Sequence, residues 1–141
     1  MVARLARQVE LALTAAQLSL PQYRILILLA EGKEAASALA DKLAVSRPSV
    51  TGVVDGLVAR GLVERHQLPD DRRRVGHDLT DEGRRLLERA DAEVERRLND
   101  VAAHHPDGAQ AAFDGLVAWR DALDGHRRAR RARAEHAEAT R

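Results

Sequence analysis

The feature that most constrains the fold is a change of apolar period in the middle of the chain. Before residue 60 and after residue 80, apolar residues recur every three or four positions, as in amphipathic helices. Between these regions, two short β-compatible segments, 62–68 and 75–79, bracket the polar hexapeptide Pro69-Asp70-Asp71-Arg72-Arg73-Arg74. A turn-forming, charged segment between two such runs predicts a β-hairpin. The fold class expected is therefore mainly α with a small β-hairpin.

Six helices are expected from the apolar stripes and from the residues that begin and end them. The boundary signals are Ser19, Gly32, Ser46, Gly61, Thr80 and the segment 104–108. The third helix, with Leu39 and Leu43 on its buried side, lacks a capping residue because Ala35 and Ala36 occupy its start. The sixth helix is expected to end where the Arg-rich tail begins.

Composition narrows the class of protein. With 141 residues, of which 45% are hydrophobic and 32% charged, the chain is long enough to form one globular domain with its own core. No apolar run is long enough to span a bilayer, and no signal-peptide pattern follows Met1. The absence of cysteine excludes disulfides and thiolate metal sites. We therefore expect a single domain over 1–141, a cytoplasmic location and no membrane partner.

Positive charge is distributed unevenly, which matters more than the net charge of +1. Arginines form one run at Arg72–Arg74 and a second run at Arg127, Arg128, Arg130, Arg131 and Arg133. The planar guanidinium suits phosphates and guanine edges. For the second run, a solvated helix face is the favoured interpretation.

The third and fourth helices, within residues 36–60, form a helix-turn-helix with the turn Ala44-Val45-Ser46. In this motif the second helix enters the major groove of DNA with its N-terminal residues against the base edges. The expected contacts on this recognition helix are Ser46, Arg47, Pro48, Ser49, Thr51 and Gly52. For the helix taken alone, an ordinary amphipathic helix whose polar face meets water remains an alternative.

The hairpin favours the DNA-binding interpretation. Consecutive arginines on a turn repel one another, and a purely structural turn has no use for them. In a winged protein the tip lies beside the minor groove, whose negative potential attracts inserted arginine. The expected wing contacts are Asp71, Arg72, Arg73 and Arg74. Asp71 either orients the Arg73 guanidinium or bonds its own backbone as a turn residue, and both roles are compatible.

The motifs resemble, in their order, those of the MarR (multiple antibiotic resistance regulator) family. They read Leu39-Ala40…Leu43, Ser46-Arg47-Pro48-Ser49-Val50-Thr51, Leu57…Gly61-Leu62-Val63-Glu64-Arg65, Pro69-Asp70-Asp71-Arg72-Arg73 and Leu79-Thr80-Asp81-Glu82-Gly83. The resemblance covers nearly the whole chain. It implies a winged helix-turn-helix lobe at 36–79, flanked by long dimerisation helices in a helical region at 1–18 and 81–136.

The resemblance further implies a homodimer that binds a near-palindromic operator in double-stranded DNA, usually as a repressor released by a small molecule. It assigns Arg73 as the wing-tip arginine and Asp71 as its supporting carboxylate. The sequence departs from the family pattern at two places. Gly52 stands where many members carry a longer polar or basic side chain, and Gly76-His77-Asp78 weakens the alternation of apolar and polar residues that is usual in the second strand of the hairpin.

The long helices carry more apolar surface than one small domain needs, so we expect them to meet a second copy. The expected dimer-interface residues are Leu5, Val9, Leu116, Trp119 and Leu123.

Sites for small ligands are less well marked. Tyr23 is the candidate polar contact of an effector pocket, although a core tyrosine with a satisfied hydroxyl is the alternative. His66 and His77, on the two hairpin strands, are compatible with facing one another, but no metal site is expected because metal-ligand spacings are absent.

No cofactor and no enzymatic activity are expected, since the sequence has neither a Gly-rich phosphate loop nor a nucleophile elbow. The main alternative function is a winged-helix protein-interaction module that does not bind specific DNA.

Overall fold

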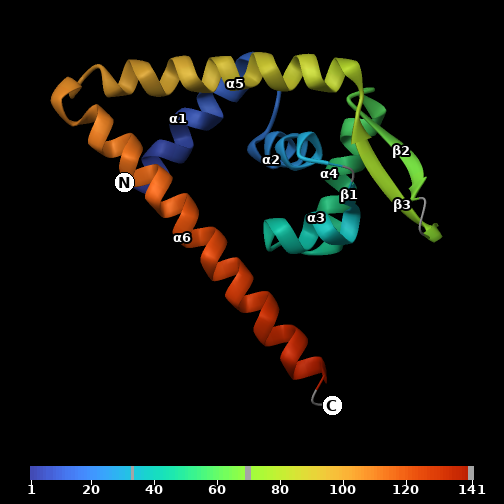
Figure 1. Cartoon of the computed structure of the whole chain (residues 1–141). Coiled ribbons are helices and arrows are strands. Elements are labelled where there is room, and N and C mark those ends of the chain that lie inside the picture. Colours follow the sequence, from blue (N-terminus) through green and yellow to red (C-terminus); the bar gives the residue numbers. More distant parts are fainter. Residues whose placement is uncertain (33, 69–70, 140–141) are drawn as a thin grey trace. The chain divides into compact units, whose positions relative to one another are not determined.

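The computed structural model describes residues 1–32, 34–68 and 71–139, and it is mainly helical with one small sheet (Figure 1). Its helices are α1 (Val2–Ala15), α2 (Leu20–Ala30), α3 (Ala36–Leu43), α4 (Arg47–Ala59), α5 (Asp81–Ala102) and α6 (Pro106–Ala139). Its strands are β1 (Glu34–Ala35), β2 (Val63–Leu68) and β3 (Asp71–Leu79). The predicted fold class is confirmed. The chain divides into two compact units, Met1–Leu98 and Asn99–Arg141.

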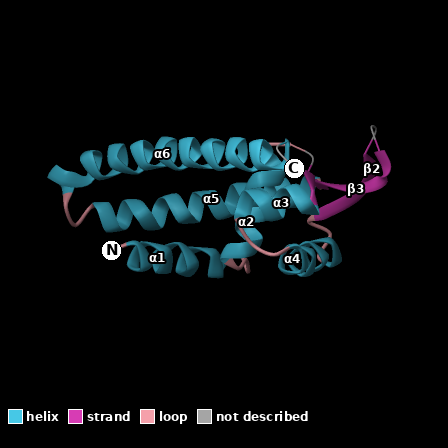
Figure 2. Ribbon diagram, turned by 90° about the horizontal axis from the view of Figure 1, so that it is seen from below, coloured by secondary structure: helices cyan, strands magenta, loops and turns pink. Residues whose placement is uncertain are grey.

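The sheet has the strand order β1-β3-β2, and both pairings are antiparallel. The hairpin register runs from Val63 opposite Leu79 to Leu68 opposite Asp71, with an irregularity between Gln67 and Leu68. In Figure 2 the hairpin extends outward from the helices of the first unit. Strand β1, which pairs Ala35 with Gly76, was not predicted from the sequence. The chain passes directly from β1, which ends at Ala35, into α3, which begins at Ala36.

Two predicted boundaries were wrong. The hexapeptide 69–74 is not all turn, because β3 begins at Asp71 and its backbone includes Arg72–Arg74; residues 69 and 70 lie outside the described part. Helix α6 does not end at the Arg-rich tail but continues to Ala139. Alanine, arginine and glutamate dominate this tail, and all three are strong helix formers.

The core of the first unit is formed by apolar residues of α1 to α5 and of the base of the hairpin. Its largest fully buried side chains are Leu13, Ile25, Leu26, Leu29, Leu39, Val50, Val54, Leu57 and Val63. His77 is also buried, with 5% of its surface exposed, at a position where the strand pattern would have placed an apolar residue. Among the described residues, no helix combines the length and the apolar character that crossing a bilayer requires.

The predicted helix starts at Ser19, Ser46 and Thr80 are confirmed by side-chain caps. Ser19 and Gln22 form a reciprocal capping box, in which the Gln22 side chain accepts from the Ser19 amide at 3.0 Å. The Ser46 hydroxyl accepts from the Ser49 amide, and the Thr80 hydroxyl accepts from the Gly83 amide at 3.0 Å. The caps fix where α2, α4 and α5 begin.

Candidate DNA-binding surface

Helix α4 presents one apolar and one polar face, as the sequence analysis expected. Val50, Val54 and Leu57 are buried in the core. The residues predicted to contact DNA are all exposed: Ser46, which is the N-cap of α4, and Arg47, Pro48, Ser49, Thr51 and Gly52 in its N-terminal part. The packing of α4 therefore leaves its outer face open to a partner.

Hydroxyl groups on this face are already used within the helix. The Ser46 and Ser49 hydroxyls lie 2.7 Å apart, and the Thr51 hydroxyl donates to the Arg47 carbonyl at 3.0 Å. The hydroxyl oxygens of Ser49 and Thr51 can each still accept a further hydrogen bond. Their positions are thus fixed by the helix before any ligand is bound.

Helix α4 carries no side chain at two positions, Gly52 and Gly56. A Cβ added at either position would meet no atom within 4 Å. Packing within the chain therefore does not require glycine here, although glycine in a helix costs about 1 kcal/mol relative to alanine. The glycines allow a close approach to the helix backbone from outside.

The base of the hairpin is joined to the end of α4 by contacts to the backbone of Gly61 and Leu62. Gly61 follows α4 with a φ of +69°, a left-handed conformation that favours glycine. The Thr80 hydroxyl donates to the Gly61 carbonyl at 2.7 Å. Gly83 approaches the Leu62 carbonyl so closely that a Cβ would lie 2.0 Å from its oxygen. Helix α4, the hairpin and α5 are therefore joined at one tight junction.

Predicted wing contacts lie in the outer half of the hairpin. The backbones of Asp71, Arg72, Arg73 and Arg74 belong to β3, while their side chains lie outside the described part of the structure. The predicted support of Arg73 by Asp71 stays a prediction.

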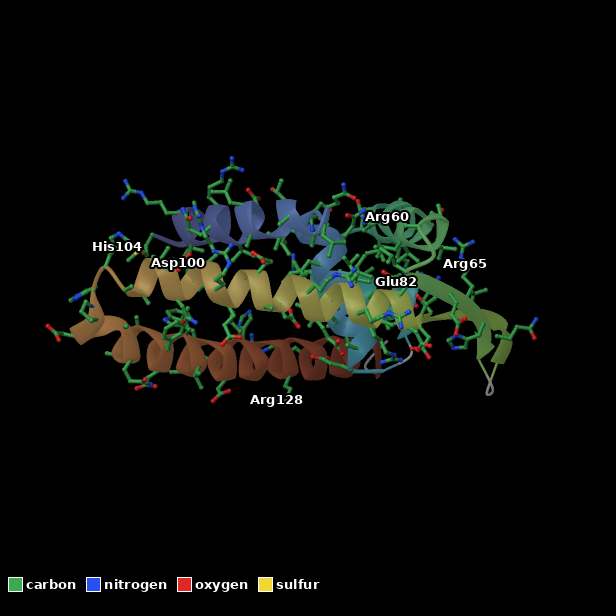
Figure 3. All side chains as sticks on the ribbon, turned by 90° about the horizontal axis from the view of Figure 1, so that it is seen from above. Arg60, Arg65, Glu82, Asp100, His104 and Arg128 are labelled. Atoms are coloured by element: carbon green, nitrogen blue, oxygen red, sulfur yellow. The ribbon has the colours of Figure 1, made fainter. Side chains whose placement is uncertain are left out.

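Two ion-pairing or hydrogen-bonding arginines around α4 were missed by the sequence analysis. Arg65 of β2 forms an ion pair with Asp55 on the outer side of α4. Arg60, at the end of α4, donates to the Gln17 carbonyl at 2.9 Å and to the Gln22 side chain at 3.5 Å. Figure 3 shows both arginines beside α4. Contacts between residues so far apart in sequence leave no local periodic signal that could have revealed them.

Tyr23 of α2 is half-buried, and its hydroxyl donates to the carboxylate of Asp91 on α5 at 2.6 Å. Burial raises the pKa of Tyr23 above its usual value, and the hydrogen bond to Asp91 and the negative charge there raise the pKa further. This contact fits a core tyrosine with a satisfied hydroxyl. Its predicted role in an effector pocket stays a prediction.

Predicted dimer-interface residues differ in how they are placed. Val9 packs partly against the core of its own chain, and Leu5 is half-buried. Leu116, Trp119 and Leu123 on α6 are 48%, 68% and 52% exposed. The three predicted interface residues of α6 are thus more exposed than Leu5 and Val9, the two predicted on α1.

The two hairpin histidines do not face one another. His66 is opposite Gly76, and His77 is opposite Arg65, so their side chains leave opposite faces of the sheet. Among the residues that the structure describes, no group of three or more potential ligands could hold a metal ion.

Comparisons with known proteins agree with this architecture. The sequence profile of the MarR family matches residues 18–75. The uncharacterised HTH-type transcriptional regulator YfiV of Bacillus subtilis is 31% identical over 112 residues, which cover 76% of this chain and 68% of YfiV. The HTH-type transcriptional regulator FarR of Neisseria gonorrhoeae is 41% identical over 81 residues, which cover 57% of this chain but only 56% of FarR.

Solved structures show the same fold. The repressor CouR bound to a 23-mer DNA duplex superposes with a TM-score of 0.71 and 28% identity, over 82% of this chain and 83% of CouR. MarR of E. coli, at 22% identity, gives a TM-score of 0.74 over 82% and 86% of the two chains. Profile, relatives and fold lead to the same assignment: the chain belongs to the MarR family of transcriptional regulators.

Proposed function

We propose that this chain is a sequence-specific transcriptional repressor that binds an inverted-repeat operator as a homodimer. The observation that carries the proposal is the exposed outer face of α4, with Arg47 at its N-terminal end, beside a hairpin whose third-strand backbone includes Arg72–Arg74. The N-terminal half of α4 enters the major groove, and the hairpin reaches the adjacent minor groove. The DNA complex of the similar repressor CouR supports this assignment.

A second copy of the chain covers the apolar face of α6. Leu116, Trp119 and Leu123 lie three or four residues apart, so they form one exposed stripe on the helix. Exposed apolar surface of this kind marks an interaction site. Leu5 and Val9 of α1 are proposed to complete the interface, and residues 1–141 to act as one functional unit, in the cytoplasm. A two-fold dimer matches the symmetry of an inverted repeat.

A small organic molecule is proposed to release the repressor from DNA. CouR of Rhodococcus jostii has been solved with p-coumaroyl-CoA, and NadR, 33% identical to this chain, with 4-hydroxyphenylacetate. Tyr23 is the proposed polar contact, because a ligand that accepts its hydroxyl hydrogen would compete with Asp91.

Operator selection tests the proposal directly. The purified protein is mixed with sheared genomic DNA at about 150 mM salt, where purely non-specific binding is weak. We expect the retained fragments to share one inverted repeat with half-site centres about one helical turn apart. Unrelated fragments, or none, would contradict the proposal and favour a protein-interaction module.

A matched pair of variants then tests the wing. Arg73→Ala should weaken operator binding and reduce the salt dependence of log K by about one unit per protomer. Arg128→Ala removes the same charge from an exposed position on α6 and should change neither quantity. If Arg73→Ala binds the operator as tightly as the wild type, Arg73 does not contact the DNA.

A further inference from the structure

The ion pair between Arg65 and Asp55 links the two elements that are proposed to read DNA. Arg65 lies on β2, two residues after the strand begins at Val63, and Asp55 lies on the outer side of α4. Both side chains remain about half-exposed, at 48% and 52%. The pair is therefore accessible to a ligand that approaches α4 and the hairpin together.

The position of the pair points to a particular part of the DNA. If α4 occupies a major groove and the hairpin the adjacent minor groove, one sugar-phosphate backbone must pass between them. Arg65 extends from the hairpin toward α4, and Figure 3 shows it beside that helix. Building on the proposed function, we propose that Arg65 binds the phosphate backbone between the two grooves and that Asp55 positions its guanidinium there.

Asp55 is unsuited to contact the backbone itself, because its carboxylate would repel the phosphates. Its contact with Arg65 engages Nη2. A guanidinium presents several N–H donors in a rigid fork, so one edge can bind Asp55 while another binds a phosphate oxygen. Asp55 is thus a positioning residue, and Arg65 is the residue that touches DNA.

The frame around the pair favours a fixed geometry. The end of α4 is held by Arg60 to the turn between α1 and α2, and the base of the hairpin is held at Gly61 by Thr80. Arg65 is therefore presented from a strand whose place relative to α4 is set before DNA arrives. Such preorganisation lowers the entropy cost of ordering a long side chain on binding.

Salt dependence of operator binding measures the phosphate contact. In Arg65→Gln the slope of log K against log salt should fall by about 0.9 per protomer, or about 1.8 for a dimer. At about 0.15 M salt this corresponds to operator binding roughly thirty-fold weaker. Arg65→Lys keeps the charge and should keep the slope. The control Arg96→Gln removes an arginine paired with Glu93 on α5 and should match the wild type.

A double-mutant cycle tests the positioning role, using the same assay on Asp55→Asn and on Asp55→Asn/Arg65→Gln. If Asp55 positions Arg65, the loss caused by Arg65→Gln is smaller in the Asp55→Asn background. An equal or larger loss there would overturn the positioning role. The double variant leaves neither Asp55 nor Arg65 as an unpaired charge. The difference between its slope of log K against log salt and that of Asp55→Asn therefore measures the phosphate contact of Arg65, even if Arg65→Gln alone does not fold.

The outcomes separate this proposal from the proposed function. Specific operator binding by the wild type, combined with an unchanged slope in Arg65→Gln, would overturn the Arg65 contact and leave the repressor assignment standing. Failure of the wild-type protein to bind any inverted repeat would overturn both.

Discussion

Gly83 is the position where a single methyl group should most disturb the junction between α4, the hairpin and α5. It lies in the first turn of α5, and its amide donates to the Thr80 hydroxyl. A Cβ at this position would lie 2.0 Å from the Leu62 carbonyl oxygen, whereas ordinary contact begins at 3.4 Å. The obstacle is backbone and cannot rotate away, so α5 or the chain at Leu62 must move by more than an ångström.

The magnitude for Gly83→Ala follows from two opposing effects. Overpacking typically costs about 1–3 kcal/mol, and a backbone obstacle places this case near the upper end. Replacing a helical glycine by alanine returns about 1 kcal/mol. The free energy of unfolding should therefore fall by about 2 kcal/mol, which lowers the Tm by about 7 °C for a chain of this size.

Thermal and urea unfolding followed by circular dichroism would measure this loss. Gly56→Ala is the matched control, because it makes the same change in a helix where the added Cβ meets nothing within 4 Å. It should raise the free energy of unfolding by about 0.5–1 kcal/mol. If Gly83→Ala were as stable as the wild type, or stabilised like the control, the close approach of Gly83 to Leu62 would be refuted.

Three further predictions follow from other contacts. Tyr23→Phe should cost about 1 kcal/mol through the lost bond to Asp91. The raised pKa keeps Tyr23 protonated in the folded state above about pH 10, where the tyrosine of the unfolded chain ionises. The free energy of unfolding, measured with urea, should therefore fall more steeply with pH in this range for the wild type than for Tyr23→Phe. Parallel pH curves for the two proteins would contradict this. Ser46→Ala should cost about 1 kcal/mol in chemical unfolding, and more than Ser49→Ala, which keeps the cap on the backbone amide. In sedimentation equilibrium at micromolar concentration, the wild type should have a mass of twice 15.5 kDa, and Trp119→Asp should have the mass of one 15.5 kDa chain. If the Trp119→Asp variant is still a dimer, Trp119 does not lie in the interface.

Local patterns predicted most of the helices and their starts. Ser19, Ser46 and Thr80 each bond an amide within their own first turn, so the signal and the structure lie within four residues of one another. The apolar spacing of Val50, Val54 and Leu57 likewise predicted which face of α4 is buried.

Elements that depend on distant partners were missed or misplaced. Strand β1 contains only Glu34 and Ala35, too few residues to show a period, and it exists through its pairing with His77 and Gly76. The arginines of β3 resemble a turn in composition, yet their backbone belongs to a strand whose flanking residues Asp71 and Val75 pair with Leu68 and Gln67 of β2.

The same reasoning applies to the candidate site. The exposed face of α4 was predictable because it follows from the buried face of the same helix. The pair formed by Asp55 and Arg65 was not, since it depends on how tightly the chain turns at Gly61 before it enters β2.

The order of the sheet also bears on the behaviour of the protein without DNA. In the part of the chain that the structure describes, β2 pairs with a neighbour on one side only, and β1 covers only two positions of β3. Unpaired strand edges invite another chain to add a strand, and charged residues at the edge oppose this. Glu64, Arg65 and the arginines of β3 place such charges along both edges. The charges proposed to hold DNA would thus also protect the free protein from aggregation through its hairpin.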